Sequence, residues 1–133
     1  MKNNLLKIIK LFFLFFTKVS SAEQYRFETS EIEIIDNGNV INASNGSATS
    51  NDGDIQIDAN KFIYLKNSNL LKAFNGIAFI KSDNLKIEFD KLELDNLNSI
   101  LTASGNNKIY DLENEISKKK DLIIFDRNSN IIK

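Results

Sequence analysis

The chain has 133 residues, a length typical of one domain, and its 17 basic residues nearly balance its 18 acidic ones. It contains no histidine and no cysteine, which removes the usual metal ligands and the common Ser-His and Cys-His nucleophile systems. The composition therefore predicts a protein that is not an enzyme and that uses no cofactor. A glycosidase-like pair of carboxylates is the one catalytic alternative that the composition leaves open.

The first 22 residues have the pattern of a secretory signal peptide. Three lysines, at positions 2, 7 and 10, precede an apolar run at residues 11–16, and small residues at 20–22 provide a cleavage site. The run is too short to span a bilayer, which takes about 20 apolar residues. We predict export and cleavage after Ala22, with an uncleaved anchor as the alternative.

Cleavage would make the chain more acidic. The leader contains four lysines and no acidic residue, so 13 basic and 18 acidic residues remain, with a net charge near −5. A nucleic-acid-binding domain would carry a basic patch, so no nucleic-acid partner is expected. The basic cluster Lys118-Lys119-Lys120 is interpreted as a solvated loop or the guard of a sheet edge, and contact with a phosphorylated lipid headgroup is a weaker alternative.

Residues 23–133 are predicted to form one all-β domain, because apolar and polar residues alternate with the period of half-buried strands. Turns are expected at residues 36–38, 51–53, 66–69 and 97–99, and Asp52-Gly53 is a strong hairpin signal. A sandwich or roll of about ten short antiparallel strands is expected. The predicted strands are residues 31–35, 40–43, 54–58, 61–66, 70–74, 77–81, 85–89, 91–95, 100–103, 108–112 and 122–125.

A sequence repeat of thirty residues runs through these strands. The phrase Ala-x-x-Gly occurs at residues 43–46 and 73–76, and Ala103-Ser104-Gly105 follows at the same interval. Apolar residues repeat with it, since the pattern of residues 55–64 returns at 85–94. Such self-similarity predicts one small β-unit that is stacked on itself.

The repeated phrases at residues 58–64, 71–78 and 100–105 resemble the OstA-like family, the periplasmic domain shared by the lipopolysaccharide-transport proteins LptA, LptC and the N-terminal part of LptD. The resemblance covers about residues 27–133. It implies a twisted β-jellyroll, open along one side, whose interior binds the lipid A acyl chains of lipopolysaccharide. It also implies a periplasmic location, an association with the outer membrane, and edge-to-edge pairing with other Lpt jellyroll domains.

An open roll has one inward-facing set of side chains, which must serve as a core, as a lipid groove or as both. The inward candidates are Ile55, Ile57, Phe62, Tyr64, Ile77, Phe79, Leu85, Ile87, Leu92, Leu94 and Ile109. The chain contains no proline that would protect a sheet edge, which permits edge pairing. A structural or adhesive β-repeat domain, with a closed core and no lipid ligand, is the alternative function.

The chain ends at Ile131-Ile132-Lys133, in the middle of a repeat. Two interpretations follow from the family resemblance. The chain is either the front part of an LptD-like protein, whose N-terminal region it resembles most, or a short LptA-like protein that acts alone. The interrupted repeat favours the first.

Overall fold

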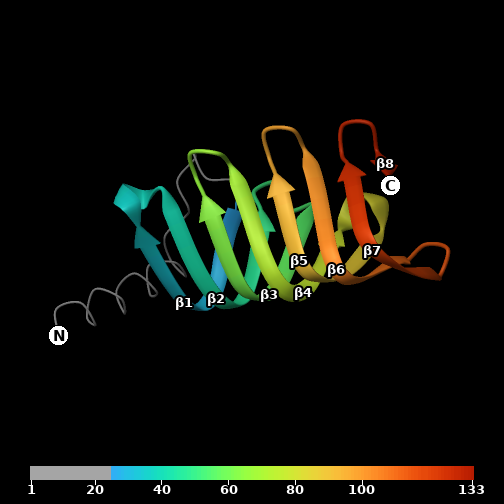
Figure 1. Ribbon diagram of the computed structural model, residues 1–133, viewed down its shortest axis with the longest axis horizontal. Coiled ribbons are helices and arrows are strands. Elements are labelled where there is room, and N and C mark those ends of the chain that lie inside the picture. The colour runs from blue at the N-terminus through green and yellow to red at the C-terminus, as the bar shows by residue number, and fades with distance from the viewer. Residues whose placement is uncertain (1–24) are drawn as a thin grey trace.

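The computed structural model describes residues 25–133 as one antiparallel sheet of eight strands, arranged in chain order (Figure 1). Two short 3-10 turns, η1 (Asp36–Gly38) and η2 (Lys81–Asp83), lie in hairpin loops. The strands are β1 (Tyr25–Ile35), β2 (Val40–Ser50), β3 (Ile55–Leu65), β4 (Leu70–Ile80), β5 (Leu85–Asp95), β6 (Ile100–Asp111), β7 (Ile116–Asp126) and β8 (Ile131–Ile132). The predicted signal peptide, residues 1–22, lies outside the described residues and stays a prediction.

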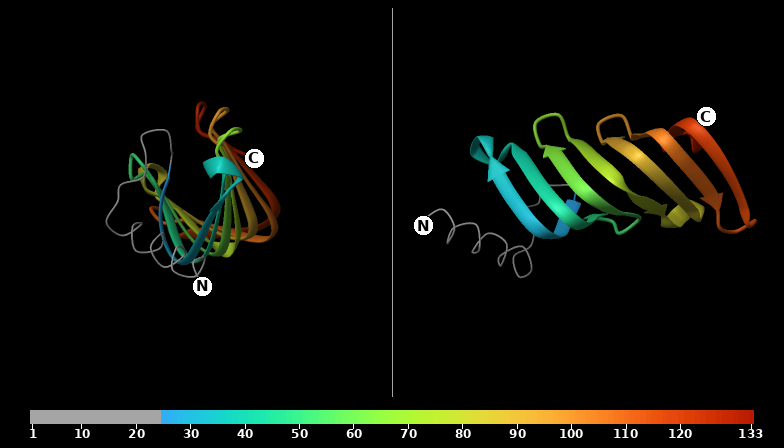
Figure 2. Two further views of the ribbon diagram at one scale, coloured as in Figure 1. Left: turned by 90° about the vertical axis from the view of Figure 1, so that its left-hand side faces the viewer. Right: turned by 60° about the horizontal axis from the view of Figure 1, so that its bottom comes forward.

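The sheet is folded along its middle into a V-shaped trough, which Figure 2 shows end-on. The fold line, called the crease below, passes through positions where strand pairing is interrupted: residues 30, 45, 60, 75 and 90. In β6 the interruption widens into a β-bulge near Gly105. Because successive crease positions are 15 residues apart, each pair of strands makes one thirty-residue repeat.

The crease divides the sheet into two walls. Wall I contains the strand halves that end in loops 36–39, 66–69, 96–99 and 127–130, and these loops form rim I. Wall II contains the halves that end in loops 51–54, 81–84 and 112–115, which form rim II, and β1 begins on this side. Backbone hydrogen bonds link the loops within each rim, as from Lys66 N to Asn39 O (2.8 Å) in rim I and from Lys81 N to Asp54 O (2.9 Å) in rim II. The two walls therefore bring the inner face of one sheet against itself.

The structure corrects the predicted strand boundaries. Segments 70–74 and 77–81, predicted as separate strands, belong to one 11-residue strand, β4, which ends at Ile80. The prediction was wrong because Asn75, at φ 54°, bends the chain without ending its pairing with the neighbouring strands. The predicted turns between hairpin strands are confirmed, and Gly53 provides the positive φ of 76° in the loop between β2 and β3.

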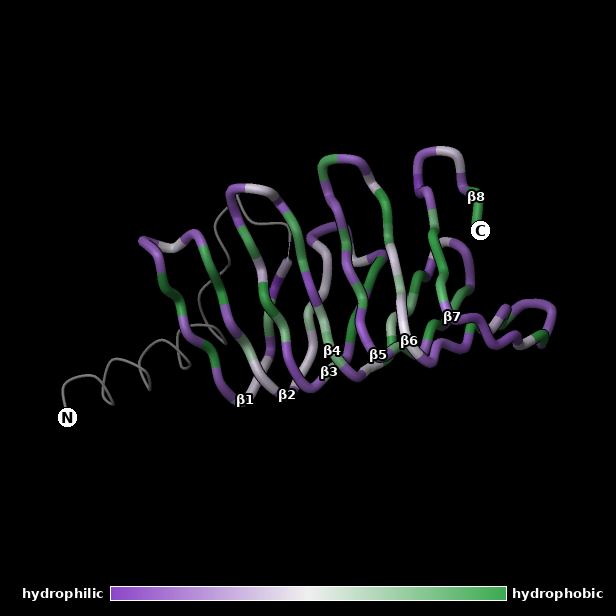
Figure 3. The backbone as a smooth tube through the Cα atoms, in the orientation of Figure 1, coloured by the Kyte–Doolittle hydropathy of each residue, from purple (hydrophilic) through white to green (hydrophobic). Residues whose placement is uncertain are grey.

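The hydrophobic core lies between the walls, and Figure 3 shows apolar residues alternating with polar ones along the strands. It consists of 24 buried hydrophobic residues drawn from β1 to β7. On neighbouring strands, large inner residues lie beside alanines: Phe62 pairs with Ala43 and Ala73, and Leu92 pairs with Ala73 and Ala103. The alanines of the repeated phrase are therefore the small partners in a core of alternating large and small side chains.

A substitution at Gly76 tests whether the strands are closely packed at the crease, because a Cβ there would overlap the carbonyl oxygen of Asp58 in β3. We expect Gly76→Ala to lower the free energy of unfolding by about 2 kcal/mol, since the strands must move apart. Gly38→Ala is the control, because Gly38 has a positive φ but open space around it, and it should cost about 1 kcal/mol. Equal losses for the two variants in urea denaturation would contradict close packing at the crease.

Candidate functional site

The inner face of the sheet is the candidate site, and strand register places its side chains in rows. One row of wall II runs through Phe27, Ala48, Ile57, Ala78 and Ile87, each directly opposite the next across neighbouring strands. Residues opposite each other in an antiparallel pair lie on the same face of the sheet. The rows consist almost wholly of apolar side chains. The inner face is therefore suited to contact with hydrophobic groups and presents few polar side chains that could take part in a reaction.

Nine of the eleven predicted inward residues lie on this face. Seven of them are at most 2% exposed, Leu85 is 7% exposed, and Ile109 is half-buried against the core. The structure thus brings together Ile55, Ile57, Phe62, Tyr64, Leu85, Ile87, Leu92, Leu94 and Ile109.

The structure contradicts the inward placement of Ile77 and Phe79. Ile77 pairs with Asp58 and Glu88, and Phe79 pairs with Gln56 and Lys86, so both lie half-buried on the polar outer face. Every residue from Ile77 to Ile80 is apolar, and alternation therefore does not distinguish the two faces here. Register decides in favour of Ala78 and Ile80, which are fully buried.

Several inner residues were not predicted from the sequence, and Tyr25 and Phe27 are the most important of them. Their rings pack at T-shaped angles across the trough, Tyr25 against Tyr64 and Phe27 against Phe62, with both pairs of ring centroids 5.8 Å apart. Edge-to-face contacts of this kind stabilise a core beyond simple burial. The thirty-residue repeat contained the signal, because Tyr25 and Phe27 precede Ile55 and Ile57 by that interval.

The interior is filled by its own side chains. Ile57, Phe62 and Ile87 are each 0% exposed, so the walls touch along the trough. A hollow of about 230 Å³ lies instead at the C-terminal end of the sheet, between Ile100, Ile124 and Ile131. A guest in the interior would therefore have to replace contacts between the walls.

Polar side chains join the two rims above this core. The Tyr25 hydroxyl, at the start of β1, donates to Asn96 Oδ1 in rim I (2.7 Å). Burial raises the pKa of this hydroxyl well above its usual range, and the hydrogen bond to Asn96 acts in the opposite direction. Arg127 Nη2 in rim I pairs with Asp54 Oδ2 in rim II (3.2 Å). The open side of the trough is thus bridged at two points.

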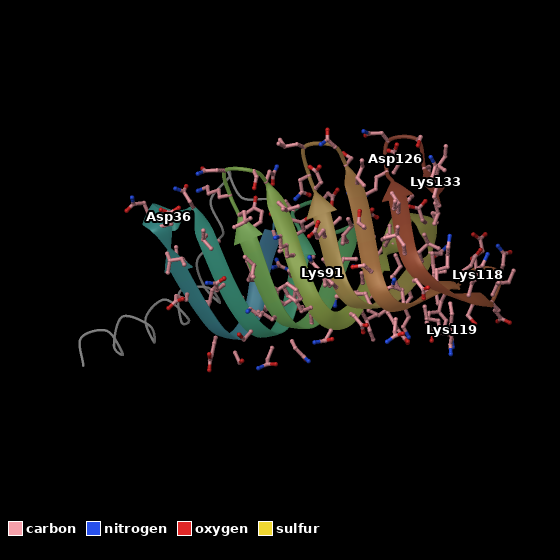
Figure 4. The ribbon with its side chains drawn as sticks, viewed as in Figure 1. Asp36, Lys91, Lys118, Lys119, Asp126 and Lys133 are labelled. Atoms are coloured by element: carbon pink, nitrogen blue, oxygen red, sulfur yellow. The ribbon has the colours of Figure 1, made fainter. Side chains whose placement is uncertain are left out.

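The two ends of the sheet differ in charge. Three acidic side chains and one basic side chain lie on β1, whereas β7 carries three basic and two acidic ones. Figure 4 shows Asp36 near the β1 end and Lys118 and Lys119 near the β7 end. Most of the large hydrophobic residues that are exposed in residues 25–133 also lie near the two ends of the sheet. They are Ile35, Leu112, Ile116, Leu122, Ile131 and Ile132, and Leu97 is the exception.

The lysine cluster is not a loop. Lys118, Lys119 and Lys120 lie within β7 and pair with residues 109, 108 and 107 of β6. Strand β8 pairs with β7 only at residues 125–126, so the described chain adds no strand beside the lysines. The loop interpretation was wrong, and the position agrees with a guarded sheet edge.

Residues 25–133 contain no group of three or more acidic residues that could hold a metal ion. No helix in this part of the chain is long and apolar enough to cross a membrane.

Comparison with known proteins identifies the fold. No family model matches the chain, and no curated protein sequence matches it. Among solved structures, the chain is similar to LptH from Pseudomonas aeruginosa, described as the LptA-homologous periplasmic component of the lipopolysaccharide transport device. The TM-score is 0.68 at 13% sequence identity, and the match covers 84% of this chain and 81% of that one.

The two proteins share a fold. The predicted open β-jellyroll of antiparallel strands is therefore confirmed, and the likeness at this level of identity concerns the fold alone.

A matched pair of isoleucines tests the assignment of faces. Ile87→Ala should lower the free energy of unfolding by about 2 to 4 kcal/mol, because it opens a cavity in the core. Ile77→Ala, on the outer face, should cost less than about 1 kcal/mol. Urea denaturation of both variants checks this, and an equal or larger loss at Ile77 would overturn the assignment.

Proposed function

We propose that this chain is a periplasmic bridge module that binds lipopolysaccharide in its apolar interior, passes it toward the outer membrane and joins neighbouring jellyroll domains edge to edge. The observation that carries the proposal is a single open sheet whose apolar inner face is enclosed by two walls. LptH, which has the same fold, is described as part of a lipopolysaccharide transport device. The signal peptide predicted at residues 1–22 agrees with export.

The inner face suits acyl chains because it is long, apolar and continuous across the strands. Each methylene that moves from water into such a surface contributes about 0.8 kcal/mol. A few acyl chains would give useful affinity without polar recognition. The transport role needs no reaction, which agrees with the predicted absence of catalysis and of a cofactor.

The filled interior is compatible with binding because of how the walls are joined. Both walls belong to one sheet, and their strand pairing is interrupted along the crease at residues such as Asn45 and Asn75. Opening the V at the crease would separate the walls while the strand pairs within each wall stay intact. Acyl chains would then replace the contacts between walls.

The proposal covers an LptA-like role and the front part of an LptD-like protein, because both contain this domain. The likeness to an LptA homologue supports the first, and the sequence resemblance to the N-terminal region of LptD supports the second.

Photo-crosslinking in cells tests lipid binding. A photoreactive phenylalanine analogue at position 62 or 87, on the inner face, should give adducts with lipopolysaccharide. The same analogue at position 77 or 79 is the control, since these residues lie on the outer face. Absence of adducts from every inner position, or equal adducts from the outer positions, would count against the proposal.

The alternative is a structural or adhesive β-repeat domain with a closed core. The near-complete burial of inner residues such as Phe62 and Ile87 favours it. The same crosslinking series separates the two functions, because a core that never opens gives no lipid adduct at any position.

Edge joining between copies of the chain can be tested by changing salt concentration and surface charge, because β1 carries more acidic side chains and β7 more basic ones. The chain from residue 23 should associate in low salt and dissociate as salt increases. Reversing charge at β1 (Glu31→Lys with Glu33→Lys) or at β7 (Lys118→Glu with Lys119→Glu) should weaken association, because either reversal removes the charge difference between the two ends of the sheet. Sedimentation velocity measures this, and a wild-type chain that stays monomeric in low salt would rule out joining between copies.

A further inference from the structure

Two contacts across the open side of the trough form a unit, called the rim clasp below: Tyr25 with Asn96, and Asp54 with Arg127. The Tyr25 hydroxyl donates to Asn96 Oδ1 at 2.7 Å, and Arg127 Nη2 lies 3.2 Å from Asp54 Oδ2. The partners are 71 and 73 residues apart in the chain. In each contact one residue belongs to wall II or rim II and the other to rim I.

Neighbouring loops hold the clasp residues in place. Asn96 Nδ2 donates to Asn69 O at 3.0 Å, and the backbone N–H of Arg127 donates to Ser99 O at 2.9 Å. On the other rim, Ser82 donates to both carboxylate oxygens of Asp54, from its N–H at 2.8 Å and from its hydroxyl at 2.9 Å. Because Asn96, Arg127 and Asp54 are each tied to their own rim, the two rims cannot part far without breaking the clasp.

The clasp lies directly above the apolar interior. Tyr25 contributes to both, since its hydroxyl binds Asn96 while its ring packs on Tyr64 inside the trough. The side chains of Arg127 and Asp54 are only 27% and 18% exposed, so their ion pair is partly shielded from water. The two contacts therefore tie the rims together directly over the buried inner face.

We propose that the rim clasp is a gate that controls lateral access of lipid to the trough. This inference rests on the proposed function, because it assigns a control element to the same lipid-binding interior. In the closed state the clasp holds the walls together. Lipid uptake from the side requires both contacts to break as the V opens at the crease.

Weakening the clasp should accelerate uptake. The double variant Tyr25→Phe with Asp54→Asn keeps side-chain size and removes one hydrogen bond and one ion pair. Its uptake of fluorophore-labelled lipopolysaccharide, followed by stopped-flow fluorescence, should be roughly five- to tenfold faster than wild type. Asp95→Asn is the control, because the Asp95 carboxylate accepts hydrogen bonds from residues 97 and 98 of its own loop and, among the described residues, from no other loop. Circular dichroism checks that each variant is folded.

Locking the rims should have the opposite effect. The chain has no cysteine, so Asp54→Cys with Arg127→Cys can be joined specifically by a bismaleimide that contains a cleavable disulfide. Uptake of the labelled lipopolysaccharide should fall more than tenfold and recover when a reductant cleaves the linker. Asn98→Cys with Asn128→Cys, joined by the same reagent, is the control within rim I, because the Asn128 side chain donates to Asn98 O at 3.4 Å.

The outcomes separate the two proposals. Unchanged uptake by the locked protein, with binding by wild type, would overturn the gate and leave lipid binding intact. Failure of the wild-type chain itself to bind labelled lipopolysaccharide would overturn the proposed function and the gate with it. Reduced uptake in both the locked protein and the rim I control would also overturn the gate, because the effect would then not depend on joining the rims.

Discussion

The structure depends on one constraint: a single sheet must bend along one line so that its inner face meets itself. The full-length strands therefore bend at the same level, and from β1 to β5 the bends recur every 15 residues. Asn45, Asn75 and Gly105 have positive φ at this level. Beside them, on β2, β4 and β6, the inner face carries alanines, because the walls are closest near the crease. The residues that pair with these alanines on the strands between are large, as Phe62, Ile87 and Leu92 are.

The same apolar surface stabilises the protein and provides its proposed site. In the closed state the walls exclude water from each other, and this burial is the main source of stability in a chain without disulfides. A lipid would compete with these contacts for the same side chains. The affinity for lipid therefore depends on the difference in free energy between lipid–wall contacts and wall–wall contacts. Contacts that bridge the open side would shift this difference toward the closed state.

An open sheet also has free ends, which a closed barrel would lack. The described chain limits pairing at these ends with charge, through acidic side chains on β1 and lysines on β7. Exposed apolar residues such as Ile35 and Ile116 remain beside those charges. The combination permits association with a suitable partner and opposes indiscriminate aggregation, as the proposed bridge requires.

The alternation of residues and the thirty-residue repeat were sufficient to predict an all-β domain of antiparallel strands, the main turns and nine inward residues, because these are local or periodic signals. The open jellyroll form was expected only from the family resemblance. Periodicity could not show that segments 70–74 and 77–81 are one bent strand, or that Ile77 and Phe79 face outward. Both depend on register with β3 and β5. The contacts of Tyr25 with Asn96 and of Asp54 with Arg127 span more than 70 residues, and only the twist and folding of the whole sheet bring those partners together.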